Sequence, residues 1–157
     1  GRNPHIKRLQ SESEEDYLIA NDALKKAEIY HLKSRSITSL SGGEWQRMIL
    51  ARALCQQSSI MLLDEPITGL DIKHQVNLMS IIAKLSKQNK ISAVFVLHDL
   101  SLANHYSDRI ILLHQGHVFK SGRPQEIMTK ENLEFVYETP INIIDNNGRK
   151  TIMPEIL

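Results

Sequence analysis

The sequence predicts an α/β fold with a mostly parallel sheet, and three features of the chain support that prediction. Apolar runs alternate with amphipathic stretches in the middle of the chain, as they do in strand–helix–strand units. The runs at 59–63 and 91–97 are short and mostly apolar, which is typical of strands buried on both faces. Residues 13–55 carry helical patterns with no strand between them, so we expect a helical subdomain ahead of the sheet.

Composition and charge indicate a soluble globular protein. The chain has 157 residues, of which 41% are hydrophobic and 24% charged, as in soluble globular proteins and unlike disordered chains. Its net charge of +1 gives no bulk basic signal for nucleic acid. The longest apolar runs, such as 93–97, have four to five residues, whereas a membrane span needs roughly 18. The single cysteine, Cys55, excludes an internal disulfide and fits a reducing compartment.

The first half of the chain is expected to be helical. Ser13 precedes apolar residues at helical spacing, and acidic residues crowd the first turn, so we expect a helix over about 13–29. Residues 33–39 form a polar connection. A second helix opens at Ser41, and its apolar stripe comprises Met48, Leu50, Ala51, Leu54 and Cys55.

The middle of the chain is expected to form two strands joined by a helix. The strand at 59–63 is closed by Pro66, and a helix runs from Asp71 to about residue 88. The second strand, 91–97, ends at His98-Asp99. We expect the two strands to be adjacent and parallel.

The last third is expected to contain only short elements. We expect, in order, a helix at 100–107, a strand at 109–114 paired with 118–120, helical turns at 124–128 and 131–137, and a hairpin of 141–144 with 150–153. Gln115-Gly116 and Asn147-Gly148 supply the turns of the two hairpins. We accordingly divide the chain into a helical subdomain at 1–57, a core at 58–122 and a C-terminal segment of helical turns and hairpin at 123–157.

The start of the second helix is the first candidate site. Ser41 and Glu44 have the spacing of a capping box, which explains both residues structurally. It does not explain Gly42 and Gly43, since each glycine in a helix costs roughly 1 kcal/mol relative to alanine. Glycines there let a ligand approach bare backbone N–H groups, and a helix N-terminus attracts anions. Phosphate binding and plain capping both remain open.

Carboxylates and a histidine follow the expected strands. Asp64 and Glu65 come directly after the first strand, where ligands of α/β sheets usually bind. An Asp there can hold Mg²⁺, and a neighbouring Glu can deprotonate a water. His98 follows the second strand and is expected at the same edge. Taken alone, Asp71 is best explained as a helix N-cap and His98 as a histidine satisfied by local backbone.

The order and spacing of these motifs closely resemble the nucleotide-binding subunit of ATP-binding cassette (ABC) transporters, over nearly the whole chain. LSGGE at 40–44 looks like the signature motif of that family, LLDE at 62–65 like its Walker B motif, GLD at 69–71 like its D-loop and His98 like its switch histidine. Trp45 departs from the pattern, because the family often has a polar or basic residue there. The GRNPH opening, the SEEDYLIANDAL helix and the HLKSRSITSLSGGE approach resemble the subfamily that imports iron complexes, heme and cobalamin.

The resemblance implies an ATPase that uses ATP and Mg²⁺ and drives a separate integral membrane permease. Two subunits would dock head to tail, with each ATP between the phosphate loop of one subunit and the signature motif of the other. Catalysis in such sites is mostly positioning and charge stabilisation. The implied roles are nucleotide contact for Ser41, Gly42, Gly43 and Glu44, coupling of the two sites for Asp71, Mg²⁺ binding for Asp64, general base for Glu65 and γ-phosphate contact for His98.

The resemblance also implies a place in the cell and a wider assembly. The subunit is expected in the cytoplasm, peripheral on the inner face of the cell membrane, with a substrate-binding protein as an indirect partner. It implies a P-loop NTPase-like fold with an N-terminal helical subdomain and a C-terminal β-hairpin.

Two other interpretations compete with an active ATPase. No G-x-x-x-x-G-K-[ST] occurs, since none of the seven glycines is followed by lysine, so the phosphate-cradling loop is absent from this chain. The chain therefore resembles the C-terminal part of a cassette ATPase that begins just after the Q-loop, and the second interpretation is that by itself it would be a non-catalytic piece. The third interpretation is a metal-dependent hydrolase built from Asp64, Glu65, His98 and Asp99, which leaves the double glycine unexplained.

The missing loop has a consequence for the sheet. In the resembling family the phosphate-loop strand lies between the strand that ends at His98 and the strand 109–114. We therefore expect 109–114 not to pair in parallel with 91–97. Unpaired strand edges leave backbone groups unsatisfied, so we expect the isolated chain to be unstable or prone to aggregation.

Overall fold

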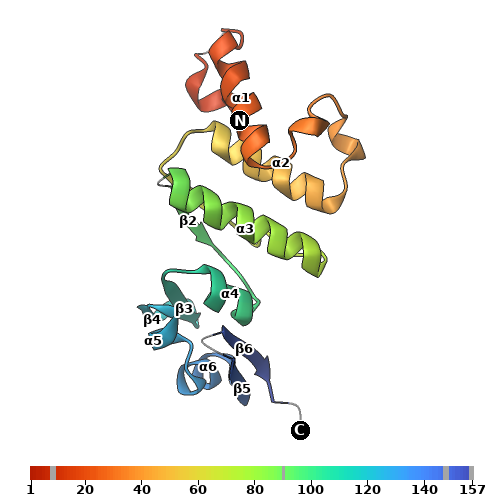
Figure 1. Ribbon diagram of the computed structural model, residues 1–157. Coiled ribbons are helices and arrows are strands. Elements are labelled where there is room, and N and C mark those ends of the chain that lie inside the picture. The colour runs from red at the N-terminus through yellow and green to blue at the C-terminus, as the bar shows by residue number, and fades with distance from the viewer. Residues whose placement is uncertain (8–9, 90, 147–148, 156–157) are drawn as a thin grey trace. The chain divides into compact units, whose positions relative to one another are not determined.

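The computed structural model describes residues 1–157 except 8–9, 90, 147–148 and 156–157. The chain forms two compact units, residues 1–96 and residues 97–157 (Figure 1). Each unit has its own helices and strands, and each is described by itself.

Two packed helices form the first part of unit 1. Helix α1 spans Glu14–Lys26 and helix α2 spans Gly42–Cys55, and the two contact each other. Each begins with a capping box, at Ser13 and at Ser41, which satisfies backbone N–H groups of the first turn. The predicted helix starts are confirmed. The side chains buried between the helices are small or branched: Ala23, Ala27, Ile29, Ala51 and Cys55.

Short 3₁₀ turns lie in the segments before and between these helices. The polar opening contains η1, Asn3–His5, and the connection between α1 and α2 contains η2, Tyr30–Leu32, and η3, Ile37–Ser39. Proline at the second position of η1 fixes the backbone dihedral that such a turn needs, a local effect that polarity alone does not reveal.

The parallel strand pair completes unit 1. Strand β1, Ile60–Leu63, pairs in parallel with β2, Ser92–Phe95, in a register that places Ile60 opposite Ser92 and Leu63 opposite Phe95. Helix α3, Ile72–Asn89, is the crossover between them, and it packs against β2 and α2. The prediction of two adjacent parallel strands is confirmed. Since the strands are parallel, their carboxyl ends lie at one edge.

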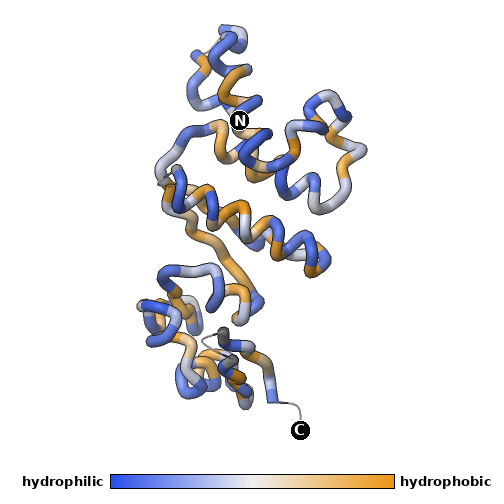
Figure 2. Tube along the Cα trace, viewed as in Figure 1, coloured by the Kyte–Doolittle hydropathy of each residue, from blue (hydrophilic) through white to orange (hydrophobic). Residues whose placement is uncertain are grey.

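The prediction that both strands are buried on two faces is wrong. Met61 is 8% exposed, but its neighbour Leu62 is 75% exposed, and Ile60 and Val94 are more than half exposed. Figure 2 shows hydrophobic residues along this part of the chain. Within the described ranges of unit 1, α3 covers one face of the pair and no second layer covers the other. The buried side chains of α3, which packs against both α2 and β2, are Leu78, Met79, Ile81, Ile82 and Leu85.

The described residues of unit 2 form two hairpins and three short helices. The structure confirms the predicted order of these elements, and both hairpins pair antiparallel. Gln115 and Gly116 have φ angles of 48° and 77°, as a two-residue hairpin turn requires, whereas the predicted Asn147-Gly148 turn lies outside the described residues. The elements are α4 Leu100–Tyr106, β3 Ile110–His114, β4 His117–Gly122, α5 Pro124–Ile127, α6 Lys130–Tyr137, β5 Ile141–Asn146 and β6 Arg149–Pro154.

The core of unit 2 joins the two hairpins to the short helices. Helix α4 packs against β6, and α6 packs against β5 and β3. The buried residues of this core are Ile110, Leu112, Ile127, Met128, Leu133, Ile141 and Ile152.

Strand β3 does not join the parallel pair. Among the described residues its ladder partner is β4, and β1–β2 form a separate sheet. This confirms that 109–114 does not pair in parallel with the strand that precedes His98. None of the helices in the described part of the chain is long and apolar enough to cross a membrane.

Candidate functional site

The first turn of α2 is closed by the Ser41–Glu44 pair. The Ser41 backbone N–H and hydroxyl donate to Glu44 Oε2 at 2.7 and 2.9 Å, and the Glu44 N–H donates back to Ser41 Oγ at 3.4 Å. These hydrogen bonds, the backbone one first, hold the pKa of the Glu44 carboxyl below its usual value. Glu44 is therefore a carboxylate at neutral pH and is engaged with its own helix cap, as the capping-box interpretation predicts.

The two glycines of this turn lie in different environments. Gly43 is buried, and a Cβ built on it would lie 2.5 Å from Cδ2 of the His74 ring in α3. Gly42 is exposed, and a Cβ there would meet Leu70 at an ordinary 3.7 Å. Packing therefore explains Gly43 without a ligand, while it leaves Gly42 unexplained. The backbone at Gly42 is open to a ligand, as the phosphate hypothesis needs.

The GLD segment is held by the first turn of α3. Asp71 Oδ1 accepts the His74 backbone N–H at 2.9 Å and lies 2.8 Å from Nδ1 of the same residue. The backbone N–H first, and then the ring, hold the pKa of the Asp71 carboxyl below its usual value. Gln75 Nε2 donates to the Leu70 carbonyl at 3.0 Å. Asp71 thus caps α3, which is the structural role that the sequence favours for it in isolation.

The end of β1 turns sharply at Glu65. Asp64 is exposed, and Glu65 has a φ of 43°, a left-handed conformation that is uncommon for a non-glycine residue. The Thr68 N–H donates to the Glu65 carbonyl at 3.2 Å, and the Thr68 hydroxyl donates to Glu65 Oε2 at 3.0 Å. Pro66 and Ile67 are buried and anchor the turn. Strain of this kind clusters at functional sites, and the Thr68 hydroxyl holds the Glu65 carboxylate.

A small cavity of about 100 Å³ lies between α2, the end of β1 and α3. Asp64 and Leu63 line it from the strand, Gln46 from α2 and Leu78 from α3. The candidate segments of unit 1 therefore share one region of that unit: the start of α2 contacts the GLD segment, and α2 borders the end of β1.

His98 and Asp99 belong to unit 2. Asp99 is the N-cap of α4, where its carboxylate accepts the Leu102 N–H at 2.8 Å. His98 is exposed and comes three residues after Phe95, at which β2 ends. The expectation that His98 lies at the same edge as Glu65 concerns residues of different units, and it stays a prediction.

The end of β1 is the place where the sequence predicts Mg²⁺ binding. No group of three or more His, Cys, Asp or Glu side chains that could hold a metal ion occurs among the residues that the structure describes. Asp64 is exposed at the end of β1 and offers one carboxylate. Mg²⁺ is commonly bound by one or two carboxylates together with substrate phosphates and water, so Asp64 fits as one ligand of a nucleotide-bound Mg²⁺. The hydrolase interpretation combines Asp64 and Glu65 of unit 1 with His98 and Asp99 of unit 2, and it stays a hypothesis.

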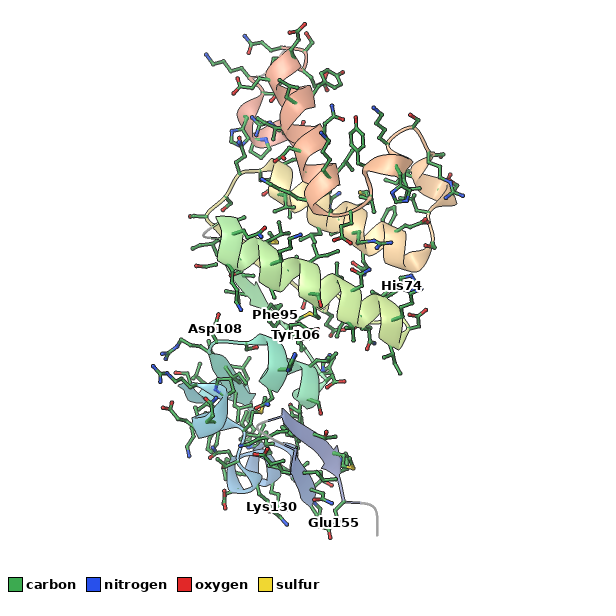
Figure 3. The ribbon with its side chains drawn as sticks, viewed as in Figure 1. His74, Phe95, Tyr106, Asp108, Lys130 and Glu155 are labelled. Carbon is green, nitrogen blue, oxygen red and sulfur yellow. The ribbon has the colours of Figure 1, made fainter. Side chains whose placement is uncertain are left out.

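Sequence reasoning missed His74 and Gln75. In Figure 3, His74 projects from the first turn of α3, and its ring contacts both the GLD segment and the start of α2. Its position three residues after the Asp71 N-cap is the place where a side chain can reach back to the cap. That spacing was visible in the sequence, but the contact with Gly43 depends on how α2 packs against α3.

Comparisons with known proteins agree with the motifs. The ABC transporter family profile matches residues 2–68. An ABC transporter ATP-binding protein of Methanocaldococcus jannaschii is 40% identical over 98% of this chain and 59% of that protein. The ferric enterobactin transport ATP-binding protein FepC of Escherichia coli is 38% identical over 93% of this chain and 54% of that protein. Other similar proteins are named for hemin and cobalamin import.

Solved structures agree as well. An inward-facing transporter described as being of the metal-chelate type is 28% identical, has a TM-score of 0.91 and is matched over 99% of this chain and 63% of its own. A dimeric cassette bound to ADP and Pi is 32% identical, has a TM-score of 0.62 and is matched over 75% of this chain and 51% of its own. The chain spans 59% and 54% of the two relatives above. Residues 2–68 match the ABC transporter family, and nearly the whole chain is similar to part of an ATP-binding cassette.

Proposed function

We propose that the full-length protein containing this chain is the ATP-binding and ATP-hydrolysing subunit of an ABC importer, and that the cargo is an iron complex, heme or cobalamin. The observation that carries this proposal is the meeting of candidate segments in unit 1. The LSGGE turn contacts the GLD segment through Gly43 and His74, and α2 borders the end of β1 at Asp64. The motifs are therefore joined in space as well as in sequence.

The start of α2 would bind the nucleotide of a second subunit. Gly42 is exposed at the first position of the helix, and backbone N–H groups with a helix dipole favour phosphate there. Ser41 and Glu44 hold the turn in shape through their capping box. Gly43 keeps the turn close to α3, and Asp71 would couple the two sites across the interface.

Glu65 would act as general base. Its backbone turn and the hydroxyl of Thr68 fix the carboxylate, so it can orient a water and accept its proton. His98 would contact the γ-phosphate. Asp64 would be the protein ligand of Mg²⁺, and that ion, when bound, supplies neutralisation of charge on the phosphate oxygens.

The partners follow from the family. A similar cassette has been solved as a dimer with ADP and Pi, which supports a head-to-tail dimer of this subunit. Relatives named as importer ATP-binding proteins support an integral membrane permease as partner and a substrate-binding protein as an indirect one. The subunit would then act in the cytoplasm, peripheral on the inner face of the membrane. The three-part division at 57 and 122 stays a prediction.

This chain alone would be inactive. It carries no lysine-containing phosphate loop, and that loop holds the β- and γ-phosphates in P-loop enzymes. The ATPase activity is therefore proposed for the full-length protein, and the chain by itself supplies the signature, Walker B and D-loop segments.

A transport assay tests the function. The full-length subunit is reconstituted with its permease and binding protein in proteoliposomes, and ATP-dependent uptake of a ferric siderophore, heme and cobalamin is measured. We expect uptake of one of these cargoes, and its loss in the Glu65→Gln variant. ATP hydrolysis without uptake of any of the three would overturn the proposed cargo class. Absence of ATP hydrolysis would overturn the proposed ATPase activity.

A further inference from the structure

We propose that His74 is a positioning residue that locks the start of α2 to the GLD segment, so that Gly43 and Asp71 keep a fixed separation. The proposal rests on the proposed function for its effect on turnover, but its geometric part stands on the contacts of His74 alone. All the residues involved belong to unit 1.

The imidazole of His74 is held on two sides. On one side Nδ1 lies 2.8 Å from Asp71 Oδ1. On the other side the ring carbon Cδ2 fills the space in which a side chain on Gly43 would begin, 2.5 Å from an ideal Cβ. The ring therefore links the second glycine of LSGGE to the aspartate of GLD, across two elements that are distant in sequence.

The ring cannot yield at one contact without weakening the other. Two ring atoms besides Cδ2, namely Cγ and Nε2, also lie within 3.2 Å of the ideal Gly43 Cβ. An alanine at 43 must therefore displace the whole ring, and displacement moves Nδ1 away from Asp71. Hydrogen bonds weaken steeply as distance and angle depart from their ideal values, so the Gly43 and Asp71 contacts are coupled through His74.

Neighbouring contacts place the GLD segment in the same way. Gln75 donates to the Leu70 carbonyl at 3.0 Å, and the His74 N–H donates to Asp71. The Leu70 side chain lies in ordinary contact distance of a Cβ on Gly42. Both glycines of the signature turn thus face residues of the GLD region, and His74 is the side chain that contacts both sides.

A double-mutant cycle on the full-length protein tests the contact. Gly43→Ala is made with His74 present and in the His74→Asn variant, and melting temperatures are measured. Asparagine places an amide near the position of Nδ1 and lacks the remainder of the ring, so it keeps a partner for Asp71 and makes room at 43. We expect Gly43→Ala to lower the melting temperature with His74 present. In the His74→Asn variant, Gly43→Ala should be neutral or stabilising, since alanine is the better helix former.

Rescue of turnover tests the positioning role. We expect His74→Ala to lower kcat about tenfold or more, which corresponds to about 1.4 kcal/mol, and His74→Asn to restore it to within about threefold. His74→Gln is the matched control, because its longer side chain carries the amide past Asp71, and it should not rescue. His31→Ala, an exposed histidine of η2, should leave both kcat and melting temperature unchanged.

The outcomes separate this proposal from the proposed function. Equal effects of Gly43→Ala with and without His74 would overturn the contact, and equal kcat for His74→Ala and wild type would overturn the positioning role. If the effect of Gly43→Ala on the melting temperature depends on His74, but the wild-type protein hydrolyses no ATP, the proposed function is overturned. The contact of His74 with Gly43 and Asp71 would still stand. Loss of kcat that His74→Asn and His74→Gln restore equally would show that Asp71 is not the partner that matters.

Discussion

The Arg2 guanidinium donates to the carbonyl oxygen of Cys55 at 2.8 Å, 53 residues further along the chain. Cys55 is the last residue of α2, so its carbonyl lacks a partner within the helix. Arg2 also donates from Nε to Asp16 Oδ1 at 2.7 Å, and both side chains are nearly buried, at 12% and 13% exposure. Arg2 therefore joins the chain opening, the first turn of α1 and the end of α2.

Replacing Arg2 should destabilise the helical part of unit 1. Arg2→Ala leaves the Cys55 carbonyl and the Asp16 carboxylate without this donor, and buried groups left in that state are costly. We expect the melting temperature of the full-length protein to fall by about 3–8 °C and Arg2→Lys to recover part of it. Lys26→Ala removes an exposed ion pair with Asp22 and should change little. An equal effect of the two alanine variants would contradict the argument.

The Arg2–Asp16 pair should also make stability depend on acid pH. Arg2, with help from Ser13, lowers the pKa of the Asp16 carboxyl below the usual value of about 3.9. A carboxyl whose pKa is lower in the folded state than in the unfolded state stabilises the fold at pH values above its unfolded-state pKa. That stabilisation is lost as the pH falls from the unfolded-state pKa toward the folded-state pKa. The difference in melting temperature between wild type and Arg2→Ala should therefore shrink between about pH 5 and pH 2. A constant difference over that range would show that Asp16 contributes nothing.

Glu65→Gln should abolish turnover in the full-length protein and leave ATP binding. The glutamine keeps the size of the side chain and an acceptor for Thr68, but it cannot take a proton from water. Loss of a general base lowers the rate of the chemical step by a factor of about 10² or more. Steady-state hydrolysis and ATP binding by calorimetry are the two measurements, and Glu12→Gln, an exposed residue, is the control. Hydrolysis within a few-fold of wild type would remove Glu65 from the role of base.

This chain alone should bind Mg-ATP weakly and hydrolyse none. Its 157 residues contain no lysine directly after a glycine, so the P-loop lysine and its glycine-rich cradle are not present to hold the phosphates. Calorimetry with the isolated chain and with the full-length protein makes the comparison direct. A micromolar dissociation constant for the isolated chain would show that the segments described above suffice for binding.

The sequence predicted elements well where the signal was local. Ser13, Ser41 and Pro124 mark helix starts through cap and proline chemistry, and Gln115-Gly116 marks a hairpin turn. These signals depend on a few neighbouring residues, so they hold whichever elements pack around them. For the same reason the capping of α3 by Asp71 was predictable.

The sequence failed where the answer depends on distant packing. The mostly apolar runs at β1 and β2 predicted burial on both faces, yet one face is exposed, because burial depends on which layers the chain supplies. The reason for Gly43 was sought in a ligand, but the structure provides the His74 ring from α3. Contacts of that kind join residues whose separation in sequence carries no pattern.

The exposed face of the parallel pair should make the isolated chain self-associate. Leu62 is 75% exposed, and Ile60 and Val94 are 57% and 52% exposed on the neighbouring positions of the pair. Exposed apolar strands with open edges are templates for association. We expect sedimentation velocity to detect species larger than the monomer at micromolar concentration. Leu62→Lys should shift the chain toward monomer, since a charge on this face opposes its burial. Leu18→Lys replaces a residue that is 69% exposed on α1, away from the strands, and should not. A monomeric wild-type chain that melts cooperatively would contradict the expectation.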